Sequence, residues 1–212
     1  VAGRIAPGAV RGKFRAGETA APLDLFRQYP VNGIQVGKKS MERLAMALES
    51  SELSSQAASV EFTSLSLHGL SVYFSENAIN QLYQHKQTGK KDEAGGFLFG
   101  EIDSGVVTVL SVSSPSSADK RSRFGFSWNK REANKTIQER FKKGLHYLGD
   151  WHTHPCSYPT PSWDDTQSIR STFLESDHQL NYFIMLILGT AGIEQSYVAL
   201  TDGKKEYQFN AK

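Results

Sequence analysis

The feature that most constrains the fold is an apolar, strand-like run over residues 145–151 that leads directly into His152 and His154. Side chains two residues apart in an extended strand point to the same side, so the two imidazoles share one face. The next segment, residues 155–161, contains three prolines and cannot continue a strand ladder. The chain must therefore turn directly after the histidines.

Beyond this turn, Ser162 is a natural helix N-cap, and Asp165 lies three residues further on, in the first helical turn. A helix start that faces the end of the histidine strand carries Asp165 toward His152 and His154. Two imidazoles and one carboxylate are a usual ligand set for catalytic zinc. Taken singly, the His-x-His pair is more often incidental and Asp165 is a capping carboxylate, but the combination predicts one Zn²⁺ per chain.

Hydrolysis at such a metal also needs a base, because the attacking water loses a proton and the leaving amine gains one. Glu93 is the candidate, since it stands at the entry to a glycine-bearing apolar strand over residues 95–100. Its local sequence, the charged run from Lys90 to Glu93, would by itself indicate a solvated side chain.

Composition changes near residue 57. Residues 1–57 are rich in Gly, Pro, Ala and Arg at the start, with one expected helix over 39–50 and a Ser-rich linker after it. This segment does not have the pattern of a domain that folds alone. We expect an N-terminal extension or arm over 1–57, flexible or derived from a partner protein, and a single domain over 58–212.

The domain has the alternating strand and helix patterns of an α/β or α+β fold. Residues 113–123 are polar and are expected to form a loop, and Asp103-Ser-Gly105 is expected to join two strands as a hairpin. We expect strands at 65–74, 95–102, 106–112, 145–151, 182–188, 195–200 and 207–210, and helices at 76–86, at 130–143 and from Ser162 onward.

Charge and composition exclude several classes of protein. A formal net charge of +2 gives no sign of a nucleic-acid or membrane partner, and no apolar run approaches the roughly 20 residues needed to span a bilayer. The single cysteine, Cys156, excludes an internal disulfide framework and a Cys-rich zinc site. No secretion signal pattern is visible, so we expect a cytoplasmic protein.

The five residues Glu93, His152, His154, Ser162 and Asp165 together resemble the signature of the JAB/JAMM (MPN-domain) metalloproteases. That signature is an upstream glutamate, then His-x-His, seven residues, serine, two residues and aspartate. The resemblance covers about residues 60–212 and implies a JAB-like mixed β-sheet flanked by helices. It also implies zinc held by the two histidines and the aspartate, Glu93 as general base and then acid, and Ser162 as the oxyanion stabiliser.

The resemblance implies a substrate as well: a peptide or isopeptide bond that follows the C-terminus of a ubiquitin-like protein or a related tail. The His-Thr-His-Pro and Pro-Thr-Pro-Ser motifs are most similar to the isopeptidase of CBASS anti-phage operons. Such an enzyme removes a signalling nucleotidyltransferase (CD-NTase) from the target amines to which ubiquitin-like conjugation enzymes have attached it. We therefore expect a CD-NTase and these enzymes as partners.

Three alternatives remain open. A non-catalytic MPN scaffold would share the fold, although such scaffolds lose the ligands that are intact here. A peptidase of another bacterial ubiquitin-like or sulfur-carrier pathway would share the site, because specificity lies in loops such as 113–127. A RadC-type protein linked to DNA gains no support from the near-neutral charge.

Overall fold

The computed structural model describes residues 59–123 and 125–212. The expected helix over 39–50, the Ser-rich linker and the domain boundary near residue 57 lie outside these residues. The described elements are β1 (Val60–Thr63), β2 (Ser71–Phe74), α2 (Glu76–Tyr83), β3 (Gly95–Asp103), β4 (Val106–Val112), β5 (Lys120–Ser122), β6 (Gly125–Ser127), α3 (Lys130–Phe141), β7 (His146–Thr153), α4 (Trp163–Glu175), β8 (Phe183–Leu188), β9 (Tyr197–Thr201) and β10 (Glu206–Ala211).

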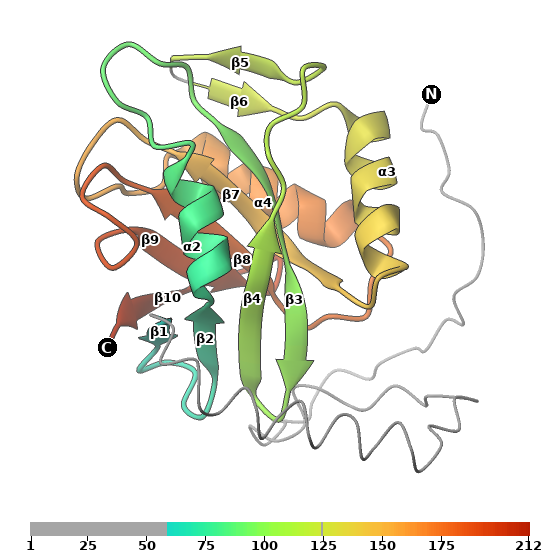
Figure 1. Cartoon of the computed structure of the whole chain (residues 1–212). Helices are drawn as coiled ribbons and strands as arrows, with labels where there is room; N and C mark the ends of the chain where they lie inside the picture. The colour runs from blue at the N-terminus through green and yellow to red at the C-terminus, as the bar shows by residue number, and fades with distance from the viewer. Residues whose placement is uncertain (1–58, 124) are drawn as a thin grey trace, which may run out of the picture.

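Eight of the strands form one sheet that closes on itself, in the order β1-β10-β9-β8-β7-β3-β4-β2, with β1 paired to both β10 and β2. The pairs β2–β4 and β7–β8 are parallel and the other pairs are antiparallel. Figure 1 shows α3 and α4 beside this ring and the two-stranded β5–β6 hairpin above it. The expected mixed sheet flanked by helices is confirmed.

The hydrophobic core contains strands whose side chains are apolar on both faces of the sheet. In β8, Ile184, Leu186 and Leu188 join the main cluster inside the ring, whereas Phe183, Met185 and Ile187 pack with Ile169 of α4. A strand covered on both sides reads as a continuous apolar run, which is why β8 is recognisable in the sequence. None of the three described helices has the length and apolar character that crossing a membrane requires.

Two predicted segments were wrong: one expected strand begins with a turn, and one expected loop contains a strand. The expected strand over 65–74 is instead a turn followed by β2, and β1 before it pairs with β2 as an antiparallel partner. Leu65, counted as strand, is 86% exposed, and Gly69 turns the chain with a φ of +82°. Residues 113–123, expected to be a loop, contain β5, whose three residues are polar and exposed and therefore lack the alternation that marks a strand.

Helix and strand ends shift by a few residues. α2 ends at Tyr83 and α3 at Phe141, earlier than expected, whereas β7 continues through Thr153. Ser75 caps α2, since its side chain accepts a hydrogen bond from the Ala78 N–H.

A β-bulge at Gly149 sets which way the side chains of β7 point. Leu98 of β3 pairs with Gly149, but Phe99 pairs with Tyr147, so Leu148 is an extra residue in β7. Gly149 has a φ of +142°, and a Cβ there would lie 2.0 Å from the Ile184 carbonyl oxygen. Because of the extra residue, Tyr147 and Asp150 lie on the same side of the strand.

We expect Gly149→Ala to destabilise the domain by about 2–6 kcal/mol, because strained backbone and steric overlap with an unyielding strand each cost about 1–3 kcal/mol. Gly144 is the matched control. It also has a positive φ, +82°, but an added Cβ there meets nothing within 4 Å. Gly144→Ala should cost about 1–2 kcal/mol. Urea unfolding of the two variants measures the difference, and equal losses would contradict the steric role of Gly149.

Candidate metal centre

Two histidines at the end of β7 converge on one point. His152 lies inside the strand and His154 directly after it, and the His154 N–H is anchored to the Leu188 carbonyl at the end of β8. The Nε2 atoms of the two rings are 3.3 Å apart, and both side chains are mostly buried. Their placement on one side of the strand agrees with the i, i+2 spacing.

The helix cap of α4 carries the third group to the same point. The Ser162 hydroxyl accepts a hydrogen bond from the Asp165 N–H at 3.1 Å, and Asp165 Oδ2 accepts one from the Ser162 N–H at 2.7 Å. The carboxylate turns one oxygen toward each imidazole: Oδ1 is 3.3 Å from His152 Nε2 and Oδ2 is 3.6 Å from His154 Nε2. The capping box therefore fixes the Asp165 carboxylate beside the two rings.

This triangle of side chains could hold one metal ion, because one ligand atom from each residue lies within 4.8 Å of the other two. Ligand atoms about 2.0–2.1 Å from a tetrahedral zinc lie about 3.3–3.4 Å from one another, and the two imidazole Nε2 atoms are 3.3 Å apart. Among the residues that the structure describes, His152, His154 and Asp165 are the one group of three with metal-binding geometry. The donor set of two imidazoles and one carboxylate suits zinc.

Glu93 lies at the edge of this triangle and is buried. Its side chain is 9% exposed, and Oε1 is 3.9 Å from His154 Nε2, so the local charged run did not predict its environment. Antiparallel pairing of β3 with β7, with Gly95 opposite His152, brings it there. Burial raises the pKa of the Glu93 carboxyl; His152 opposes this effect and Asp165 adds to it. A raised pKa suits a group that accepts and returns a proton near neutral pH.

The other two charged groups have pKa shifts that suit ligands. Burial, and secondly the charge of His152, lowers the pKa of His154 and favours the neutral ring that binds metals. Burial alone would raise the pKa of Asp165, but His152 and the Ser162 hydrogen bonds outweigh it and hold that pKa well below the ordinary value. The ring and the carboxylate are therefore in their ligand forms near neutral pH.

The β5–β6 hairpin, which lies outside the closed sheet, forms hydrogen bonds with the backbone of Glu93. The Glu93 N–H donates to the Ser122 carbonyl at 2.8 Å, and Arg121 Nε donates to the Glu93 carbonyl at 2.7 Å. Phe126 of the hairpin packs so closely on β3 that a Cβ at Gly95 would lie 2.6 Å from its ring. Sequence reasoning missed both contacts of β5, because a short polar strand gives no periodic signal.

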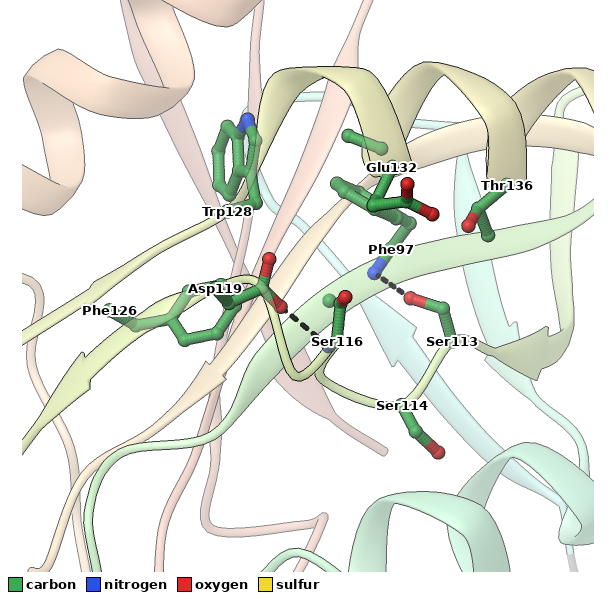
Figure 2. Close-up of a pocket in the computed structure, with 11 residues that line it drawn as sticks. Phe97, Ser113, Ser114, Ser116, Asp119, Phe126, Trp128, Glu132 and Thr136 are labelled. Carbon is green, nitrogen blue, oxygen red and sulfur yellow. Dashed lines mark hydrogen bonds between the residues drawn. The ribbon is translucent and has the colours of Figure 1, made fainter.

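The base of the hairpin closes over a small hollow between β3 and the start of α3, shown in Figure 2. Asp119 ties the two ends of the hairpin segment together: one carboxylate oxygen accepts from the Ser116 N–H and the other from the Asn129 N–H. Ser113 accepts a hydrogen bond from the Phe97 N–H of β3 in the same region (Figure 2). The hairpin is therefore held in place at its base as well as at Glu93.

The tryptophans and the cysteine close to the site in sequence differ in their exposure to solvent. Trp151 is 1% exposed and belongs to the core, whereas Trp163, at the start of α4, is 75% exposed. Cys156 is an exposed free thiol in the loop between the ligands.

The fold and the site together define a JAB-type domain: a closed mixed sheet with flanking helices holds two histidines, an aspartate and a buried glutamate at one place. The family model for prokaryotic homologs of the JAB domain matches residues 75–200. This range includes Glu93, His152, His154, Ser162 and Asp165. The chain belongs to this family.

Curated relatives carry a name that indicates a hydrolase. The chain is 31% identical over 120 residues, 56% of its length and 67% of the relative's, to a CD-NTase/cGAS isopeptidase of Enterobacter hormaechei subsp. hoffmannii. It is 29% identical over 126 residues, 58% of its length and 78% of the relative's, to a protein of the same name from Escherichia coli. A solution structure of a Desulfitobacterium hafniense protein aligns with a TM-score of 0.46 and 22% identity, over 66% of this chain and 88% of that one.

Proposed function

We propose that this protein is a zinc-dependent isopeptidase that cleaves the bond after the C-terminus of a conjugated protein. The observation that carries the proposal is a buried glutamate, Glu93, whose carboxylate lies 3.9 Å from His154 Nε2 in a His-His-Asp group whose ligand atoms lie within 4.8 Å of one another. Zinc held by His152, His154 and Asp165 would supply Lewis acidity, which polarises a scissile carbonyl and lowers the pKa of water.

The protein's own groups would move the protons. Glu93 accepts a proton from the attacking water and gives it to the nitrogen of the leaving amine, so the amide bond breaks and water is added across it. The Ser162 hydroxyl accepts its capping hydrogen bond through a lone pair, which leaves its hydrogen free to donate to the oxyanion.

The substrate we propose is a CD-NTase joined through its C-terminus to an amine of a target protein. The relatives' printed name supports this substrate, and the motifs resemble the isopeptidase of CBASS anti-phage operons. Enzymes that form such conjugates would act in the same cytoplasmic pathway, with no nucleic acid or membrane involved. The domain responsible would span residues 58–212.

An extended tail would enter along the β5–β6 hairpin. Every strand of the described ring is paired on both sides, so the ring offers no open edge to an added strand. The hairpin forms a separate two-stranded sheet with an outer edge on each strand, and β5 bonds directly to Glu93. A tail that adds to the hairpin as a strand would have its carbonyl end near the candidate centre.

We expect cleavage directly after the substrate protein's last residue. The purified protein, incubated with a CD-NTase linked to a lysine-bearing carrier, should release the intact CD-NTase and a free lysine amine, both identified by mass spectrometry. A linear fusion to a ubiquitin-like sulfur carrier is the comparison substrate, and preferential cleavage of it would favour the alternative pathway. Cuts inside folded sequence would contradict the proposal, and no cleavage of either substrate by zinc-loaded protein would favour a scaffold.

A further inference from the structure

One buried carboxylate beside the candidate centre has an oxygen without a partner. Asp150 is 7% exposed, and its Oδ1 accepts a hydrogen bond from the Tyr147 hydroxyl at 2.7 Å. Its Oδ2 is one of two buried side-chain polar atoms in the described residues that have no hydrogen-bond partner, the other being the hydroxyl of Ser111. A buried acceptor left without a donor is costly, so its presence calls for a physical reason.

The neighbours of Asp150 on the sheet do not supply that donor. Phe97 of β3 and Met185 of β8 lie directly beside it in the ladders, and both side chains are apolar. The next residue along the same face of β7 is His152, two positions on.

His152 has the complementary need. Its Nε2 faces His154 and Asp165, so the ring nitrogen on the other edge, Nδ1, carries the hydrogen when Nε2 binds a metal. Metal-binding imidazoles almost always donate this second N–H to a carboxylate, a carbonyl or water, which fixes the tautomer and the orientation of the ring.

Resting on the proposed zinc site, we propose that in the zinc-bound protein Asp150 Oδ2 accepts the Nδ1–H of His152, a contact that the structure does not itself contain, and so positions this ring for the metal. Asp150 is in turn held by Tyr147, whose ring packs edge-on against Phe183 and Phe97 at centroid distances of 5.0 and 6.0 Å. The bulge at Gly149 makes this possible, because it places Tyr147 on the same side of β7 as Asp150. Asp150 is a positioning residue that touches no substrate.

The test is Asp150→Asn with zinc affinity as the readout. The amide keeps the shape and can still accept from Tyr147, but it then turns an NH₂ group toward the His152 N–H. Competition with a chelator should show zinc binding weakened about 10–100-fold, the usual loss for such a partner. Ser111→Ala removes the other unpartnered buried polar atom and is the matched control, with zinc affinity expected to stay within twofold of the unmodified protein.

The proposed hydrogen bond can also be observed by NMR in the unmodified protein. In zinc-loaded protein labelled with ¹⁵N-histidine, His152 should show a slowly exchanging Nδ1–H signal, and Asp150→Asn should shift or abolish it. A folded Asp150→Asn protein with unchanged zinc affinity, or a His152 ring that carries its hydrogen on Nε2, would overturn this inference and leave the proposed function standing. Failure of the unmodified protein to bind zinc would overturn the proposed function together with it.

Discussion

Replacing Glu93 by alanine should lower the catalytic rate by roughly 10²–10⁴ while zinc binding stays intact. This is the usual loss for a general acid–base group, and Glu93 lies outside the ligand triangle, so its removal breaks no bond to the metal. Glu93→Gln should be nearly as slow, because the amide keeps the shape and loses the basicity. Rates are measured on the CD-NTase conjugate at matched zinc content.

Glu101→Ala is the matched control for Glu93, since Glu101 is a glutamate of β3, the strand that follows Glu93, and its side chain is exposed. Its rate should equal that of the unmodified protein. The conjugate should still bind Glu93→Ala, which would make this variant a trap for uncleaved substrate. A Glu93→Ala protein that cleaves at a near-normal rate would remove Glu93 from the mechanism.

The second large effect concerns the ligands themselves. The unmodified protein should contain about one zinc per chain, and His152→Ala, His154→Ala and Asp165→Ala should each weaken zinc binding more than 100-fold. A lost ligand bond should exceed the 10–100-fold cost of losing an outer partner, and hydrolysis should fall with occupancy. Inductively coupled plasma mass spectrometry of dialysed protein gives the zinc content directly.

Asp164 offers a control for the aspartate, because it is the adjacent carboxylate in the same first turn of α4. Asp164→Ala should keep full zinc content. Asp165→Ala also removes half of the capping box, so Ser162→Ala separates the two effects: it loses the cap, at about 0.5–2 kcal/mol of stability, but keeps all three ligands. Full occupancy in the three ligand variants would refute the candidate centre.

The sequence predicted those parts of the fold whose signal is local and periodic. β3, β4 and β8 are apolar on one or both faces and were placed within one or two residues. The arrangement of His152, His154 and Asp165 is also local, because one strand, one turn and one helix cap build it. Their geometry therefore agrees with the spacing, while their roles remain predictions for the experiments above.

The parts that the sequence left open depend on contacts between distant segments. Glu93 stands 59 positions before His152, and only the register of β3 against β7 places it at the centre. The positions of Arg121 and Asp150 could not be predicted for the same reason. Arg121 reaches Glu93 from a hairpin that is separate from the main sheet. Asp150 lies on the same side of β7 as Tyr147 because a bulge shifts the alternation of side chains along the strand. Neither leaves a periodic signal in a single sequence.

The closure of the ring by β1 has a mechanical consequence. Phe62 of β1 pairs antiparallel with Ala211 of β10, and Glu61 accepts a bond from the Lys212 N–H and forms an ion pair with its ammonium group. Residues 60 and 212 therefore lie at the same end of one ladder. Tension between these two points would peel β1 from β10 one hydrogen bond at a time, rather than shear several bonds at once. Forced unfolding of the domain between them would begin there, at the ladder that closes the ring.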